Sequence, residues 1–206
     1  MDRKQHWDAV YAAKRPEELT WFQAEPAVSL ALIRRAGAGP EERVLDVGGG
    51  TSLLSSFLLE EGFQDVSALD ISGEALARAR GQLGVRAQEV EWIEADLLAF
   101  DPPRQWSLWH DRAVFHFLTE PEDREAYCRV LNRGLETGGH VIIGTFAPDG
   151  PTRCSGLEVV RYSPQTLGAV LGSEYELMGS VPEAHQTPKG GTQSFVYSWF
   201  QRRGNV

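Results

Sequence analysis

A glycine-rich turn with carboxylates placed around it is the first group of residues in the chain that could do chemistry. Asp46 lies within a short apolar run that leads into Gly48, Gly49 and Gly50, and Asp70 closes the next apolar run. Three glycines turn the backbone tightly and leave room for a ligand to lie against it. An acid at the end of the following strand is how a doubly wound fold receives the hydroxyls of a ribose. The spacing therefore predicts a site for an adenosine-containing cofactor.

Two details of this turn bear on which adenosine cofactor fits. A dinucleotide site favours a third small residue at the end of Gly-x-Gly-x-x-Gly, and that position is Leu53. Asp46 would face the turn, where a carboxylate repels a pyrophosphate and suits a cationic ligand. Both details favour a cationic cofactor over a dinucleotide.

The segment from Leu45 to Thr51 resembles the first motif of the class I S-adenosylmethionine-dependent methyltransferases. Three further motifs follow in the order of that family. Leu69-Asp70-Ile71-Ser72 looks like its ribose motif, residues 93–97 look like its adenine motif, and residues 135–143 look like its turn into the fifth strand, with Thr137 where proline is usual. The resemblance covers about residues 40–146.

The resemblance implies S-adenosyl-L-methionine as cofactor and S-adenosyl-L-homocysteine as product. Asp70 would accept the ribose hydroxyls, and Asp96 would receive the adenine amino group. Each acid could instead cap a helix or turn, and Ile71 could be an ordinary core residue. The cofactor-binding residues expected on this basis are Asp46, Gly48, Gly49, Gly50, Asp70, Ile71, Asp96 and Leu97.

The elements that must position these residues alternate between strand and helix. Apolar runs predict strands over 43–47, 66–70, 90–95, 107–110 and 140–146, with helices over 52–61, 73–82 and 120–134 between them. This alternation predicts a doubly wound α/β fold with a mainly parallel sheet and helices on both faces. Closing strands are expected over 175–182 and 194–201, and the resemblance implies seven strands with the last one antiparallel.

We expect one methyltransferase domain over residues 1–206. Within it, residues 1–40 would form a helical lid, 41–146 the cofactor-binding core, and 147–206 the substrate-side elaboration and the C-terminal strands. Ligands in such sheets bind beyond the carboxyl ends of the strands. The loops that leave those ends are therefore expected to form the active site.

The fourth expected strand leads into the candidate catalytic residues. Asp111 stands where many members of the family place a substrate-facing residue or a base, although Arg112 could simply pair with it. His110 and His116 are the next candidates for a general base, and His185 is a weaker one. His116 follows two apolar residues and could simply be a half-buried core histidine. The motif that family members acting on glutamine or adenine amino groups often carry here is absent.

Three segments are expected to enclose the acceptor. They are the aromatic N-terminus, the Pro/Gly-containing loop 147–162 and the hairpin around 183–193. Each candidate also has an ordinary structural interpretation as a packing residue or a solvated charge. The candidate substrate-binding residues are Trp21, Phe22, Arg112, Arg153, Cys154 and His185.

The composition narrows the classes of partner. The chain carries 20 Lys and Arg against 29 Asp and Glu, a net charge of −9, which disfavours a nucleic-acid substrate. Two cysteines fit a reducing compartment, and neither a signal segment nor a membrane-spanning run is evident. We expect a cytoplasmic monomer or homodimer, with no metal because the spacing of His and Cys is not that of a ligand set.

These observations predict methyl transfer by in-line displacement to a small-molecule acceptor or a protein side chain. A protein base is needed only if the acceptor must lose a proton. Two alternatives remain open. A nicotinamide-dependent oxidoreductase is disfavoured by Leu53 and Asp46, and a non-catalytic S-adenosylmethionine-binding module would need the same cofactor site.

Overall fold

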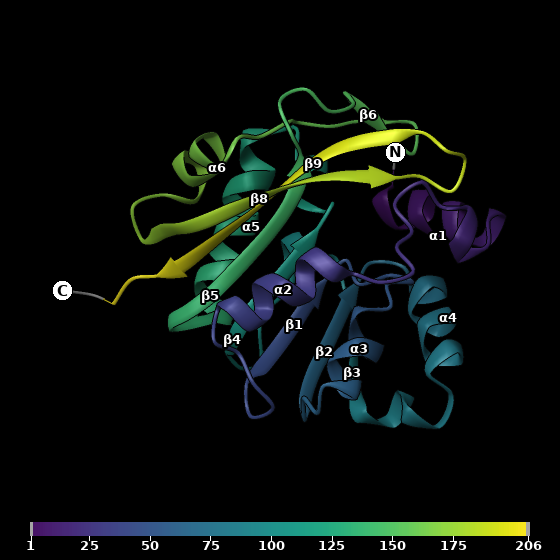
Figure 1. Ribbon diagram of the computed structural model, residues 1–206, viewed down its shortest axis with the longest axis horizontal. Coiled ribbons are helices and arrows are strands. Elements are labelled where there is room, and N and C mark those ends of the chain that lie inside the picture. The colour runs from purple at the N-terminus through teal and green to yellow at the C-terminus, as the bar shows by residue number, and fades with distance from the viewer. Residues whose placement is uncertain (1, 205–206) are drawn as a thin grey trace.

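A seven-stranded sheet forms the centre of the computed structural model, which describes residues 2–204 (Figure 1). Its order is β3-β2-β1-β4-β5-β9-β8. The first five strands in that order run parallel, and β9 pairs antiparallel with both β5 and β8. The predicted doubly wound fold, with the last strand antiparallel, is confirmed. The strands are β1 (Arg43–Val47), β2 (Asp65–Asp70), β3 (Val90–Glu94), β4 (Trp106–Arg112), β5 (Leu135–Phe146), β8 (Tyr175–Gln186) and β9 (Thr192–Arg202).

Helices cover both faces of this sheet. Side chains of α5 and α6 pack with Trp109 and Val141 on one face, and side chains of α2 and α3 pack with Val44 and Leu108 on the other. The helices are α1 (Arg3–Ala13), α2 (Ala27–Arg35), α3 (Leu54–Glu60), α4 (Gly73–Leu83), α5 (Pro121–Gly134) and α6 (Pro164–Leu171). Short 3-10 turns are η1 (Pro16–Glu18), η2 (Gly84–Glu89), η3 (Leu97–Ala99) and η4 (Phe115–Phe117), and β6 (Arg153–Cys154) pairs with β7 (Leu157–Glu158).

The alternation of side chains along β1 and β4 decides which functional groups can meet. Asp46 of β1 and His110 of β4 are register partners, and His110 points to α2. Val47 and Asp111 are the next pair, and Asp111 points to α5, where Tyr127 donates a hydrogen bond to it. Successive residues of a strand face opposite sides. Asp46 and His110 therefore share one face of the sheet, and Asp111 lies on the other.

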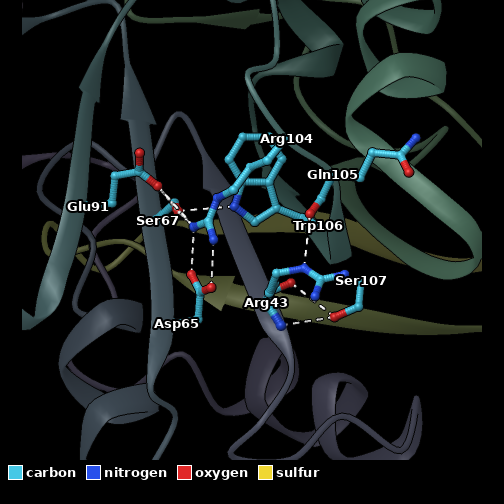
Figure 2. Close-up of polar contacts among 8 residues, drawn as sticks. All are labelled: Arg43, Asp65, Ser67, Glu91, Arg104, Gln105, Trp106 and Ser107. Atoms are coloured by element: carbon cyan, nitrogen blue, oxygen red, sulfur yellow. Dashed lines mark hydrogen bonds and ion pairs between the residues drawn. The ribbon is translucent and has the colours of Figure 1, made fainter.

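A polar cluster secures the amino-terminal end of the sheet, opposite the carboxyl ends where ligands bind (Figure 2). Arg104 pairs with Asp65 at the start of β2, and its Nη2 lies 2.9 Å from Oε2 of Glu91. The Ser67 hydroxyl donates to Glu91 at 2.8 Å and accepts from the Trp106 indole at 3.0 Å. These contacts hold the segment that enters β4 against β2 and β3.

Most strand boundaries lie within two residues of the sequence prediction, and two differ by more. The fifth strand begins at Leu135 rather than at 140, because Leu135 pairs with Trp106 before an irregularity in the register. The next strand continues to Gln186 rather than ending at 182, because it pairs with β9 as far as Thr192. None of the helices within residues 2–204 combines the length and apolar character that a membrane crossing needs.

Candidate active site

The turn after β1 is held tightly against β2 and leaves no room for side chains. The backbone N–H groups of Gly48 and Gly49 donate to the Leu69 carbonyl at 2.7 and 3.1 Å. Gly48 has φ +64° and Gly50 has φ +48°, a region that glycine adopts readily. A Cβ on Gly48 would overlap Val114, and one on Gly50 would overlap the Tyr11 hydroxyl. The positive φ angles and the lack of space for a Cβ therefore both require glycine at positions 48 and 50.

Two cavities adjoin this turn at the carboxyl ends of the strands. The larger, of about 170 Å³, has Asp70, Ile71, Asp96 and Leu97 along its wall. The smaller, of about 50 Å³, is lined by the predicted cofactor residues Asp46 and Gly49. Gly50 lies beneath Tyr11 and lines neither of them. Four residues line both cavities and so mark where the two adjoin: Tyr11, Trp21, Gly48 and Arg112.

Asp70 is a buried carboxyl group in the wall of the larger cavity. Its Oδ1 accepts the Ser72 N–H at 2.8 Å, and Gly50 also donates a backbone hydrogen bond to it. Burial raises the pKa of Asp70 to about 7, since the two N–H groups only partly offset the loss of water. The alternative that Asp70 caps a helix does not describe the structure, because Ser72 caps α4 through the Ala75 N–H.

Asp46 has one carboxylate oxygen that is engaged and one that is not. His110 Nδ1 lies 2.7 Å from Oδ1, whereas Oδ2 is buried without a hydrogen-bond partner and lies against Gly49. A buried acceptor with no donor costs free energy. A ligand with a cationic donor at this end and a ribose near Asp70 would satisfy both carboxylates, and the methionine and adenosine portions of S-adenosylmethionine have these groups. The residues present fit that cofactor.

Asp96 caps a turn, as the sequence allowed, and also lies in the wall of the larger cavity. Its Oδ1 accepts the Leu98 N–H at 3.0 Å and begins η3, and its Oδ2 lies 3.6 Å from Arg3 at the rim of the cavity. Ile71, Leu97 and Leu98 form an apolar wall next to it. This end of the cavity offers an apolar surface with one carboxylate next to it, a setting that suits an adenine ring.

The N-terminal segment forms the wall opposite these strands. Trp7 packs edge-on against Trp21 and Phe117, with ring centroids 6.0 and 5.0 Å apart. Helix α1 lies beside α4 (Figure 1), and the Ser72 hydroxyl donates to Asp8 at 2.6 Å. Lys4 of the same helix pairs with Glu94 of β3 at 2.8 Å. These contacts hold the aromatic side chains of the predicted lid against the cavity.

Arg112 is the most buried cation in the cavity wall. Its Nε donates to the Tyr197 hydroxyl at 2.7 Å and its Nη1 to the Trp21 carbonyl at 2.8 Å, and the guanidinium lies 4.8 Å from the centre of the Phe195 ring. Its Nη2 makes no hydrogen bond and lies 3.9 Å from Glu183. Arg112 does not pair with Asp111, contrary to the alternative considered from sequence.

Asp111 and His116 are not brought to either cavity. Asp111 accepts the N–H groups of Val114 and Phe115 and the hydroxyl of Tyr127, and it is fully buried. Burial raises the pKa of Asp111 to about 6. His116 is buried against Phe146, and burial lowers its pKa to about 3. These positions assign structural roles to both side chains and offer no support for general-base roles.

The remaining candidates are divided between the cavity and the surface. Cys154 and Trp21 line the larger cavity, and burial raises the pKa of the Cys154 thiol. Phe22 lines the smaller one. His185 lies on an outer groove, where its Nε2 contacts the Thr20 carbonyl at 2.8 Å, and burial lowers its pKa. Arg153 is exposed, contacts the Gly156 carbonyl within its own hairpin and lines neither cavity.

Sequence reasoning missed several residues of the site. Ser29 of α2 is buried and lies 2.8 Å from Nε2 of His110. Its signal was a single hydroxyl inside the apolar helix Ala-Val-Ser-Leu-Ala-Leu-Ile. Within residues 2–204 no group of three or more His, Cys, Asp or Glu side chains is arranged to hold a metal ion. Other cavity residues not anticipated are Arg3, Val114, Phe117, Leu118 and Leu157.

Comparison with known proteins places this site in a wider context. Residues 44–139 match the family model described as a methyltransferase domain. The ubiquinone biosynthesis O-methyltransferase of Yersinia pestis (strain Pestoides F) is 26% identical over 171 residues, which are 82% of this chain and 63% of that protein. The chain thus spans a little under two thirds of the length of the curated relatives it matches.

Solved structures share the fold at low sequence identity. A structure from work on the conversion of a disulfide bond into a thioacetal group during echinomycin biosynthesis superposes with a TM-score of 0.78 at 19% identity, covering 98% of this chain and 93% of that one. The N-methyltransferase NodS from Bradyrhizobium japonicum WM9, in complex with S-adenosyl-L-homocysteine, gives 0.72 at 15% identity, covering 96% and 98%.

The matched segment contains β1 through the start of β5 and therefore the glycine turn, Asp70 and Asp96. The fold superposes on these two solved structures over nearly the whole chain. Residues 44–139 thus match a methyltransferase domain, and the chain shares its fold with solved methyltransferases such as NodS.

Proposed function

We propose that this protein transfers a methyl group from S-adenosyl-L-methionine to a small-molecule acceptor. The observation that carries the proposal is the pair of adjoining, partly open cavities at the carboxyl ends of β1, β2 and β4, which are lined by the carboxylates Asp46, Asp70 and Asp96 and by aromatic side chains. Bound there, the cofactor supplies an electrophilic methyl group on a sulfonium. Among the relatives, the ubiquinone biosynthesis O-methyltransferase is named for a small acceptor.

The residues of the cavity have distinct parts in this proposal. Asp70 accepts the ribose hydroxyls, and Ile71 and Leu97 contact the adenine with Asp96 at its edge. Trp7, Trp21 and Phe117 exclude water from the acceptor end. In-line displacement gains most from alignment and desolvation, which such a wall provides.

The acceptor brings its own nucleophile in this proposal. Asp111 and His116 lie outside the cavity, and Nδ1 and Nε2 of His110 are both engaged. Arg112 lines both cavities, and its Nη2, which forms no hydrogen bond and lies 3.9 Å from Glu183, is the cation that we expect to meet an acidic or carbonyl group of the substrate. An acceptor that is already ionised, or is a neutral amine, needs no protein base.

Incubation with methyl-labelled cofactor and a cell extract tests the proposal. Label is expected in the small-molecule fraction with the wild-type protein and not with Asp70→Ala. Label in the protein fraction would move the acceptor to a side chain. Binding of S-adenosyl-L-homocysteine with no label transferred would favour a non-catalytic module, and preferential binding of NAD would favour the oxidoreductase.

A further inference from the structure

A row of three buried polar side chains runs from helix α2 to the glycine turn. The Ser29 hydroxyl lies 2.8 Å from Nε2 of His110, and Nδ1 of His110 lies 2.7 Å from Oδ1 of Asp46. The three residues are 1%, 2% and 3% exposed. They come from α2, β4 and β1, so only the folded sheet brings them together.

The chemistry of these groups decides which of them donates and which accepts each hydrogen bond of the row. A carboxylate only accepts hydrogen bonds, so Nδ1 of His110 carries a proton and donates it to Asp46. In the neutral ring Nε2 then accepts from the Ser29 hydroxyl. Ser29 in turn lies beside the Tyr197 hydroxyl, which accepts from Nε of Arg112 at 2.7 Å. The row thus leads from a cation in the cavity wall to the carboxylate under the turn.

The surroundings make this row costly to keep. All three residues border the smaller cavity, and the rest of this face of the sheet is filled by Val44, Leu108 and Ile142, together with the apolar side of α2. Polar groups in such a core cost free energy unless each is paired, and apolar residues of similar size would pack there without that cost. Every hydrogen-bonding atom of Asp46 and His110 in the row is paired except Oδ2 of Asp46.

We propose that His110 and Ser29 are positioning residues for the cofactor. By fixing Oδ1 of Asp46, they hold its free Oδ2 against Gly49, where it receives the α-ammonium group of the cofactor's methionine portion. His110 and Ser29 act through Asp46 and do not themselves bind the ammonium. This inference rests on the proposed use of S-adenosylmethionine and goes beyond it by assigning roles to two residues outside the family motifs.

The affinities for two ligands distinguish a positioning role of Ser29 and His110 from a purely structural one. S-adenosyl-L-homocysteine carries the ammonium group, whereas 5′-methylthioadenosine carries the same adenosine without the amino-acid portion. Ser29→Ala and His110→Gln should weaken binding of the first by about 5- to 20-fold, because a displaced carboxylate keeps only part of a charge-assisted hydrogen bond. Binding of the second should stay within about twofold of wild type.

Ser67→Ala is the matched control. Ser67 is a fully buried serine with side-chain partners at the opposite end of the sheet (Figure 2), so its loss disturbs the core to a similar degree without touching Asp46. It should change neither affinity. Equal losses for both ligands in Ser29→Ala, or unchanged S-adenosyl-L-homocysteine affinity, would overturn the proposal.

A double-mutant cycle gives an independent measurement. Asp46→Asn should weaken S-adenosyl-L-homocysteine binding by about tenfold or more, the range for a lost charge-assisted contact. Ser29→Ala added to Asp46→Asn should then cost little further, because its effect passes through Asp46. Full additivity would exclude that route. If the wild-type protein does not bind S-adenosyl-L-homocysteine at all, the proposed function fails; if it binds and the variants show no selectivity, only the positioning roles fail.

Discussion

The affinity for S-adenosyl-L-homocysteine should rise with pH up to about 7, and Asp70→Asn should remove that dependence. Burial raises the pKa of Asp70 to about 7, so the carboxyl group of the free protein keeps its proton at mildly acidic pH. Only the ionised form accepts hydrogen bonds from both ribose hydroxyls. Binding below pH 7 therefore requires loss of that proton.

The size of the effect follows from proton linkage. Affinity should fall about tenfold for each pH unit below 7 and level off above it. Calorimetry at about pH 6, in two buffers of different ionisation enthalpy, should show close to one proton released on binding, and none above about pH 8. In Asp70→Asn the affinity at pH 8 should be about 10- to 150-fold weaker, the equivalent of a lost hydrogen bond to a charged group, and independent of pH.

The raised pKa of Asp70 also predicts the direction in which the stability of the folded protein changes with pH. The unfolded chain loses this proton near pH 4, whereas the folded protein keeps it up to about pH 7. The folded state therefore binds more protons in this window, and stability falls as the pH rises through it. A rise in pKa from 3.8 to about 7 corresponds to roughly 4 kcal/mol as an upper bound.

Asp70→Asn keeps an acceptor for the Ser72 and Gly50 N–H groups and has no charge to bury. Relative to wild type, it should gain stability in urea unfolding at about pH 8 compared with about pH 5. Asp111, whose pKa is also raised, contributes equally to both proteins and cancels in the comparison. The reasoning is refuted if no proton is released at pH 6, or if Asp70→Asn binds with the same pH dependence as wild type.

Three further changes test other parts of the structure. Asp111→Ala should lower the free energy of unfolding by about 2–4 kcal/mol in urea titrations, because three donors lose their acceptor. Its affinity for S-adenosyl-L-homocysteine should stay within a few-fold of wild type. A loss of turnover with unchanged stability would restore a catalytic role for Asp111. Gly50→Ala should weaken cofactor binding in calorimetry by about tenfold or more, since its Cβ displaces the Tyr11 hydroxyl. Gly81→Ala in α4, which has open space around it, should leave cofactor binding unchanged. Equal affinities of the two variants would contradict the close packing of Tyr11 on Gly50. Deleting residues 1–22 should abolish methyl transfer and also weaken cofactor binding, because Trp7 and Tyr11 line the cavity; full activity in a transfer assay would show that the segment is packing alone.

The sequence by itself determined the fold class and most of the residues that border the cavities beside the glycine turn. Apolar runs that alternate with helical patterns specify a parallel sheet, and the carboxyl ends of neighbouring parallel strands must meet at one edge. Asp46, Gly48, Asp70 and Asp96 follow or end such strands, so their proximity needed no knowledge of packing. Their local motifs contain the information that places them.

The role of the fourth strand was decided only by the tertiary structure. His110 and Asp111 are adjacent, and nothing local distinguishes which of them lies on the face that borders the smaller cavity. The register of β4 against β1 sets His110 beside Asp46, and the alternation of the strand then turns Asp111 towards Tyr127 of α5. Ser29 joins the row because α2 packs on that same face. Pairing partners and covering helices are contacts between distant segments, and the order of residues along the chain does not contain them.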